Sequence, residues 1–223
     1  GVLEVADPVA LGTEPGTLRA ELLADPYFRD VPSMQPERRK TAWMFHAKDD
    51  VPEVRREVFR VLMHHPVQFF AVVRDKHTVL DYVRQRNRLD ERYRYHPNEL
   101  YDTMVARLFK NRLHMTPEVH VCFAERGKSD RSAALGQALE TARKRFETQW
   151  QLSNSSVIRA RQSSPRREVP LQATDYFLWA LQRYFERGES RYIEMLWPQV
   201  GLVHAVDETE VAPYGVYYTK KKP

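Results

Sequence analysis

The chain has 223 residues, of which 42% are hydrophobic, and a formal net charge of +5. This length and composition can bury a sizeable apolar core, which we expect to form a single domain over residues 1–223. No apolar run approaches the ~18 residues of a membrane span, so we expect a cytoplasmic protein without a membrane partner. The one cysteine, Cys122, excludes an intramolecular disulfide framework and suits that reducing compartment.

Arginine carries most of the positive charge, since 26 of the 35 basic residues are Arg. Its planar guanidinium group forms bidentate hydrogen bonds with phosphate and stacks on bases, so the composition is compatible with nucleic acid as a partner. A net charge of +5 spread over a whole surface is equally compatible with an ordinary basic protein. The composition by itself therefore favours neither explanation.

Apolar periodicity predicts that strands and helices alternate along the chain. The first half predicts a strand at its start, a short helix over 16–24, a short strand over 41–46 and a helix over 51–65. A continuous apolar run over 66–76 predicts a strand that is covered on both faces.

The second half of the chain continues this alternation. Its predicted elements are a helix over 98–114, a strand over 118–127, a helix over 129–146, an edge strand over 155–162, a helix over 170–192 and extended segments over 200–208 and 214–222. Such an order indicates an α/β layered sheet, in which sites form outside the carboxyl ends of parallel strands.

Two acids, Asp75 and Glu125, each follow a predicted strand in which every second residue is apolar. Each acid occupies the next position in that alternation. A charge at that position turns into solvent or finds a cation, because burial of an unpaired carboxylate is costly. Each acid taken alone reads as a solvated strand end, or as a partner of Arg74 or Arg126 beside it. The shared pattern predicts neighbouring strands of one sheet with both acids at the same edge.

A third acid, Asp175, lies at the border of the apolar face of the helix predicted over 170–192. An acid in the first turns of a helix stabilises it by ~0.3–1 kcal/mol through the helix dipole. The alternative is that the helix delivers Asp175 to the strand ends that carry the other two acids. We expect this helix to dock on the sheet through three leucines, Leu171, Leu178 and Leu181.

Carboxylates that converge on one point repel one another unless a dication holds them. Oxygen-rich sites of this kind suit Mg²⁺ or Mn²⁺, and two such ions can clamp the attacking and leaving oxygens of a phosphodiester. Asp75, Glu125 and Asp175 are therefore our candidate catalytic and metal-binding residues.

Several separated segments resemble, in the same order, the uncharacterised bacterial family called domain of unknown function 3800. They are FHAKDD at 45–50, FFAVVRDK at 69–76, NELYD at 98–102, FAERGKSDR at 123–131, LQATDYFLWALQRYFERGESRY at 171–192 and YGVYYTKK at 214–221. The likeness covers nearly all of the chain from about Leu18 onward. It implies an RNase H-like fold related to RuvC-type nucleases, with a mixed sheet flanked by helices and acids on the first strand, on later strands and on the last helix.

Carried over residue by residue, this likeness places Asp75, Glu125 and Asp175 at the later acid positions of the family. Asp175 matches most clearly, in LQATD, and His46 matches a motif histidine without an assigned role. Members typically begin with an Asp-Glu-Ser-Gly strand, which this chain does not contain. We therefore expect either a fold that is incomplete at the N-terminus or a protein that has lost the first acid.

The segment over 88–100 interleaves arginine with tyrosine, and its centre is Arg92, Tyr93, Arg94 and Tyr95. Loops of this composition hold single strands of nucleic acid by stacking and by phosphate contact. The alternative is a tyrosine-rich loop that packs on its own domain. No P-loop, dinucleotide or GxSxG motif occurs in the sequence, so those three chemistries have no support.

These features together predict a metal-dependent nuclease that hydrolyses phosphodiester bonds of a nucleic acid. Members of the family are often encoded beside mobile elements and defence genes, so a defence role is an analogy. The alternative is a non-catalytic nucleic-acid-binding or partner-docking subunit that retains the fold. Either protein could have a protein partner or form a homo-oligomer.

Overall fold

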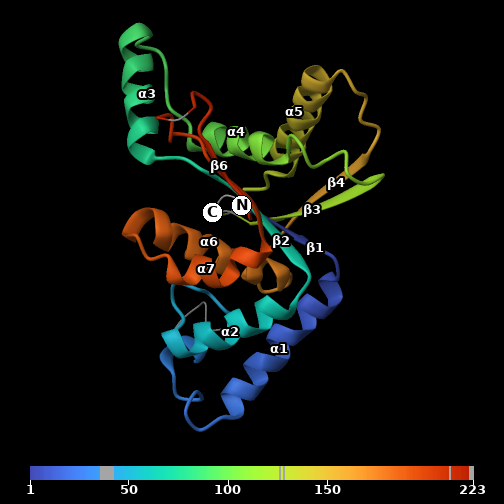
Figure 1. The fold of residues 1–223 in the computed structure, drawn as a ribbon, viewed down its shortest axis with the longest axis vertical. Helices are drawn as coiled ribbons and strands as arrows, with labels where there is room; N and C mark the ends of the chain where they lie inside the picture. Colours follow the sequence, from blue (N-terminus) through green and yellow to red (C-terminus); the bar gives the residue numbers. More distant parts are fainter. Residues whose placement is uncertain (36–42, 126, 128, 211, 221–223) are drawn as a thin grey trace. The chain divides into compact units, whose positions relative to one another are not determined.

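The computed structural model describes residues 1–35, 43–125, 127, 129–210 and 212–220. Strands and helices are mixed along the chain, which confirms the α/β class (Figure 1). In chain order the elements are β1 (Val2–Val5), α1 (Pro8–Ala24), η1 (Pro32–Met34), α2 (Pro52–His64), β2 (Val67–Val73), α3 (Lys76–Leu89), α4 (Pro97–Phe109), β3 (Glu118–Ala124), α5 (Ser132–Trp150), β4 (Val157–Ser163), α6 (Pro170–Arg187), α7 (Arg191–Leu196), η2 (Trp197–Gln199), β5 (Val200–Ala205) and β6 (Val216–Tyr218). Among the described residues, no helix has the length and apolarity needed to cross a membrane.

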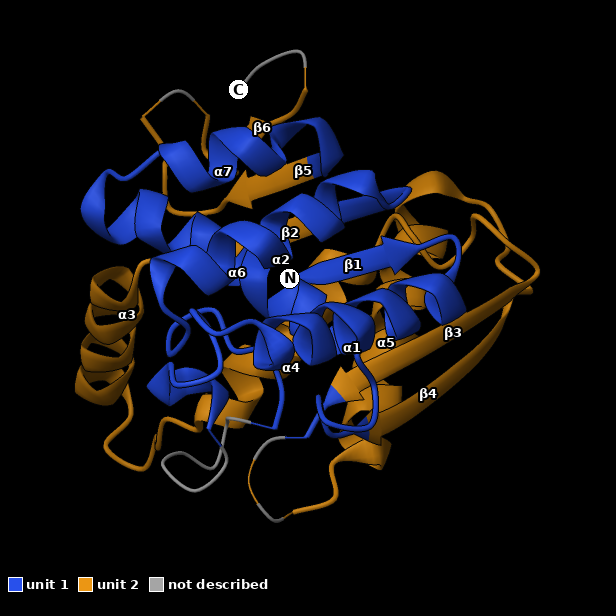
Figure 2. Ribbon diagram, turned by 90° about the horizontal axis from the view of Figure 1, so that it is seen from below, with its two compact units in different colours: residues 1–69, 124–126, 163–201 blue, residues 70–123, 127–162, 202–223 orange. Residues whose placement is uncertain are grey.

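The chain divides into two compact units, each assembled from separated segments (Figure 2). Unit 1 contains residues 1–69, 124–126 and 163–201, and unit 2 contains residues 70–123, 127–162 and 202–223. Compactness does not decide whether each unit folds alone, so the single domain expected over 1–223 stays a prediction.

The strands form two sheets in the described part of the chain, in the orders β1-β2-β5-β6 and β3-β4. The strands β5 and β6 are antiparallel. Just past the ends of β2 and β5, the N–H of Val206 donates to the C=O of Val73 at 3.1 Å, so these two strands run in the same direction. The carboxyl ends of β2 and β5 therefore lie at the same edge of the sheet.

The expectation that the strands before Asp75 and Glu125 are neighbours is wrong. The strand β2 pairs with β1 and β5, whereas β3 pairs with β4 in the other sheet. The N–H of Val157 donates to Pro117 C=O at 2.9 Å, and that of Glu125 donates to Ser163 C=O at 3.0 Å. An apolar face that ends in an acid is a local pattern, and it does not specify which strand lies alongside.

The buried face of α6 overlaps the expected one but is shifted around the helix. Leu181 is buried as predicted, but Leu178 is 38% exposed, and Gln172 and Tyr176 are buried instead. Phe177 stacks on Phe69, with ring centroids 5.0 Å apart. The polar groups of Gln172 and Tyr176 can be buried because they form hydrogen bonds within unit 1. The spacing of apolar residues along the helix does not predict these partners.

Two further local expectations differ from the structure. Residues 43–46 form a turn and loop rather than the end of a strand, and residues 41–42 of the predicted strand lie outside the described residues. The helix α3 was not predicted from periodicity. Val79 is the one residue buried along it, whereas Leu80 and Tyr82 are exposed.

Candidate functional site

The loop over residues 45–50 in unit 1 is closed by the carboxylate of Asp50. The backbone N–H groups of Asp49 and Asp50 donate to the C=O of His46 at 3.0 and 2.9 Å. The Asp50 Oδ2 atom accepts in return from the N–H of His46 at 2.8 Å. These bonds fix the backbone on both sides of the His46 side chain.

The helix α6 holds the same loop through two side chains on one of its faces. Gln172 Oε1 accepts from the N–H of Phe45 at 3.0 Å. One turn later, Asp175 Oδ2 accepts from the N–H of Ala47 at 3.0 Å. Residues three positions apart lie on the same side of a helix, so Gln172 and Asp175 can both bind the loop, one before and one after His46.

A third side chain of α6, Tyr176, reaches the loop through its hydroxyl group, which donates to Asp50 Oδ2 at 2.6 Å. Asp50 is only 3% exposed, and its burial raises its pKa, although the hydrogen bonds from Tyr176 and from the N–H of His46 oppose that rise. Burial, together with the charge of Asp50, raises the pKa of Tyr176 well above its ordinary value. Tyr176 therefore keeps its proton and remains the donor.

Arg55 of α2 supports the loop from another element of unit 1. Its Nη1 atom donates to the C=O of Ala47 at 2.9 Å and also to the C=O of Asp50. The Arg55 guanidinium carbon lies 4.7 Å from the ring centroid of Trp179, which follows Asp175 by one turn of α6. Carbonyl and N–H groups of the loop are thus both engaged, as buried backbone requires.

His46 lies between the two anchored positions of the loop, Phe45 and Ala47. Its side chain is 32% exposed, and its Nδ1 atom lies 3.8 Å from Asp49 Oδ2. Among the described residues, that Nδ1 atom is buried without a hydrogen-bond partner. A partly accessible imidazole beside a carboxylate is the type of group that transfers protons in general acid–base catalysis.

The three predicted acids have different surroundings. Asp175 is half-buried in unit 1 and has one oxygen engaged by Ala47. Glu125, also in unit 1, is exposed just after β3, and its predicted neighbour Arg126 lies outside the described residues. Asp75 belongs to unit 2, where its Oδ1 atom accepts from the N–H of His77 at 2.8 Å and caps the start of α3.

One acid at the carboxyl edge of the four-stranded sheet escaped the sequence reasoning. Asp207 follows β5, and its Oδ2 atom accepts from the N–H of Asp75 at 2.7 Å and from Arg74 Nε at 3.0 Å. The sequence could have indicated it, because Asp207 occupies the next alternate position after Val203 and Ala205, as Asp75 and Glu125 do after their strands. Its pairing with Arg74 makes it a support for the end of β2.

No group of three or more His, Cys, Asp or Glu side chains in the described part of the chain could hold a metal ion. The carboxylates of Asp175 and Asp75 are already used by backbone N–H groups. Each of these two bonds engages one carboxylate oxygen, and the described residues do not by themselves supply the six oxygen ligands that Mg²⁺ or Mn²⁺ usually takes.

The predicted nucleic-acid-binding residues lie together in the loop between α3 and α4 of unit 2. Arg94 Nη1 donates to the C=O of Glu91 at 2.6 Å and of Tyr93 at 2.9 Å. Arg92 is exposed, as is the ring of Tyr95 at 38%. The loop thus leaves an arginine and a tyrosine open to solvent.

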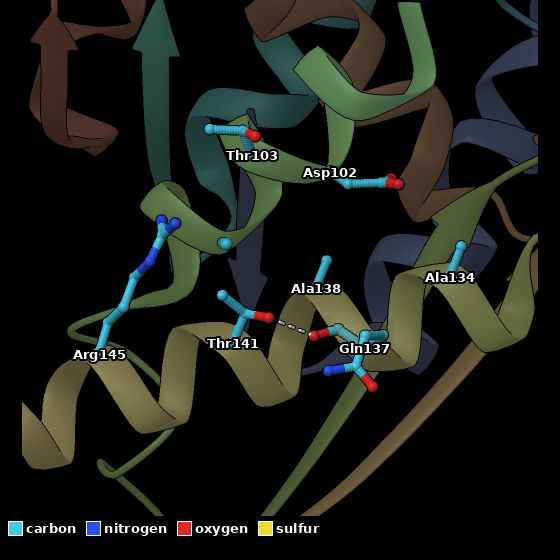
Figure 3. Close-up of a pocket in the computed structure, with 8 residues that line it drawn as sticks. Asp102, Thr103, Ala134, Gln137, Ala138, Thr141 and Arg145 are labelled. Carbon is cyan, nitrogen blue, oxygen red and sulfur yellow. Dashed lines mark hydrogen bonds between the residues drawn. The ribbon is translucent and has the colours of Figure 1, made fainter. Parts of the chain in front are cut away.

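A groove of about 260 Å³ runs between α4 and α5 in unit 2. Asp102 and Thr103 of α4 line it opposite Ala138 and Thr141 of α5 (Figure 3). Asp102 is held by Arg131 through two hydrogen bonds of 2.6 and 2.8 Å. None of the predicted site residues lines this groove.

Comparison with family models, with curated proteins and with solved structures finds no match for this chain.

Proposed function

We propose that this chain is a cytoplasmic, metal-dependent nuclease of RNase H-like fold. Its catalytic centre would lie where α6 brings Asp175 to the loop that carries His46. The observation that supports this proposal best is the pair of bonds from Gln172 and Asp175 to the backbone on either side of His46. Because Gln172 and Asp175 bind the backbone on both sides of His46, they hold in place the loop that carries the imidazole.

Within the proposal, His46 holds or moves the proton of the attacking water or of the leaving oxygen. Asp49 Oδ2 lies 3.8 Å from its Nδ1 atom. Asp175 positions the loop with one oxygen. Mg²⁺ or Mn²⁺, when bound, would stabilise the charge that develops on the phosphate. The described residues do not complete such a site, so the proposal requires at least one further carboxylate.

The substrate class follows from charge and from the likeness to the family. The chain has an excess of arginine, a net charge of +5 and an Arg-Tyr loop, all of which suit a phosphodiester polyanion. The six segments of the likeness include FHAKDD and LQATD, and those two segments meet through the bond from Ala47 to Asp175.

The second candidate is a non-catalytic nucleic-acid-binding or partner-docking subunit. The observation that favours it is the structural use of the acids: Asp175 binds the N–H of Ala47, and Asp75 binds the N–H of His77. Neither bond needs a metal ion.

A cleavage assay decides between the two functions. This chain and the full product of its gene are incubated with labelled single- and double-stranded DNA and RNA, in Mg²⁺, in Mn²⁺ and in EDTA. We expect cleavage that needs a dication and falls ~10²–10⁴-fold in His46→Asn. Lys48→Ala, which changes an exposed residue of the same loop, is the control and should cleave normally. Absence of cleavage by the full product under all conditions would leave the second candidate.

A further inference from the structure

Two tyrosines of unit 2, Tyr214 and Tyr217, are exposed although the backbone beneath them is firmly held. Tyr214 is 62% exposed and Tyr217 is 41% exposed. Their ring centroids are 6.1 Å apart, with planes inclined by 46°. Two rings at that separation form one aromatic surface rather than two scattered side chains.

The ring of Tyr217 is supported from below by His204. The two residues lie opposite each other on the antiparallel strands β6 and β5. Their ring centroids are 4.0 Å apart, and the ring planes are inclined by only 15°. His204 is 5% exposed and covers one face of the Tyr217 ring, which is 41% exposed in total.

The backbone that carries Tyr214 is fixed by the same histidine and by a tight turn. His204 Nε2 lies 2.8 Å from the C=O of Tyr214. The N–H of Gly215 donates to the C=O of Ala212 at 3.0 Å, with Pro213 at the turn position that this residue favours. Gly215 has φ +90°, and a Cβ atom there would lie 2.3 Å from the C=O of Ala205.

Core packing does not account for this construction. The turn contains a constrained glycine and engages a buried histidine, yet both rings keep a substantial exposed surface, 62% for Tyr214 and 41% for Tyr217. Exposed aromatic rings on a constrained loop are characteristic of binding surfaces. The charge around the rings is mixed: Glu210 is exposed in the same loop, whereas Asp207 pairs with Arg74 and Glu208 accepts from the hydroxyl of Tyr218. Arg107 of α4 is exposed and close enough to His204 to act on it electrostatically, and Lys220 is exposed just after β6.

We propose that Tyr214 and Tyr217 form a platform on which bases of a single-stranded nucleic acid stack, with Arg107 and Lys220 contacting its phosphates. Stacking needs accessible ring surface, which Tyr214 at 62% exposed and Tyr217 at 41% exposed provide. It tolerates any base, because every base has a π-face. The ligand class rests on the proposed function, but the platform does not require that the chain cleave its ligand.

The test is fluorescence anisotropy in EDTA, so that cleavage plays no part. The probes are a labelled oligothymidylate and an abasic strand of the same length, which keeps the phosphates and lacks the bases. We expect the Tyr214→Ala, Tyr217→Ala double variant to lose roughly 5- to 150-fold in affinity for the oligothymidylate for each lost stack. The wild-type protein should bind the abasic strand about as weakly as the double variant binds the oligothymidylate.

Two control variants separate stacking from folding. Tyr217→Phe keeps the ring and should bind within about twofold of wild type. Tyr27→Ala removes a tyrosine of unit 1 that is 66% exposed and should leave binding unchanged. Equal wild-type affinity for the two strands, or full affinity in the double variant, would overturn the platform. Tight, stacking-dependent binding in EDTA, together with no cleavage in the separate assay with Mg²⁺ or Mn²⁺, would overturn only the nuclease. No binding of either strand would remove both proposals.

Discussion

The backbone N–H of Ala47 donates to Asp175 Oδ2 at 3.0 Å, across 128 positions of sequence. Ala47 is 0% exposed, so its N–H group has no access to water as an alternative partner. The acid is therefore neither a simple helix-start charge nor a free carboxylate. It is half-buried and holds the loop of His46 with one of its oxygens.

This bond makes Asp175→Ala and Asp175→Asn behave differently in unfolding. Alanine leaves a buried N–H group without a partner, which should lower the free energy of unfolding by ~1–3 kcal/mol. Asparagine keeps a carbonyl oxygen that can accept from Ala47, so its stability should remain within ~0.5 kcal/mol of wild type. Urea denaturation measures both. Equal losses in the two variants would show that the charge, rather than the acceptor, is what stabilises the loop.

Gly215→Ala should be strongly destabilising. A side chain at φ +90° is strained, and the new Cβ would meet backbone atoms of Ala205 and Val206, which cannot move independently. We expect a loss of ~1–3 kcal/mol, which lowers the melting temperature.

The control for this substitution is Gly136→Ala in α5, where nothing lies within 4 Å of the added Cβ. Alanine there should raise the free energy of unfolding by ~0.5–1 kcal/mol, because glycine is a poor helix former. A Gly215→Ala variant that melts as high as wild type would contradict the strained turn.

His204 makes stability depend on pH. Burial lowers the pKa of its imidazole in the folded state, and nearby Arg107 lowers it further, although the hydrogen bond to Tyr214 opposes the shift. The unfolded chain therefore binds this proton more readily, with a pKa of ~6.5. The stability that the neutral imidazole contributes is present above that value and is lost as the pH falls below it.

The measurement for His204 is the difference in melting temperature between wild type and His204→Phe from pH 7.5 to pH 5. Phenylalanine keeps a ring beneath Tyr217 but cannot titrate, and the other histidines are common to both proteins. The wild-type protein should lose stability relative to the variant as the pH falls. A constant difference would show that His204 titrates alike in the folded and unfolded states.

Local periodicity predicted the elements whose stability comes from an apolar stripe. The helix predicted over 129–146 is α5, in which Leu135, Leu139, Ala142 and Phe146 recur at helical spacing and are all buried. The helix α3, which buries only Val79, was not predicted. Strand order failed because the partner of β3 depends on hydrogen bonds to β4, which no apolar pattern encodes.

The candidate site was predictable only in part. Asp175 and His46 were singled out from the sequence, but the bond of Asp175 to Ala47 and the burial of Gln172 depend on segments more than a hundred residues apart. Tyr214 and Tyr217 were read only as part of the extended segment over 214–222 and of the family-like segment YGVYYTKK at 214–221. Their role as a surface depends on the register that places His204 opposite Tyr217.

The central claim, that Asp175 belongs to a metal-dependent nuclease site as well as to the loop, is tested most directly by calorimetric titration of Mn²⁺ into the full gene product and its Asp175→Asn variant. Each titration is accompanied by a thermal melt of the same metal-free sample. We expect the variant to keep the wild-type melting temperature and to lose Mn²⁺ binding at least tenfold, because asparagine retains the acceptor for Ala47 but removes the charge. Unchanged Mn²⁺ binding, or no Mn²⁺ binding by either protein, would contradict the claim and leave Asp175 as a residue that only holds the loop.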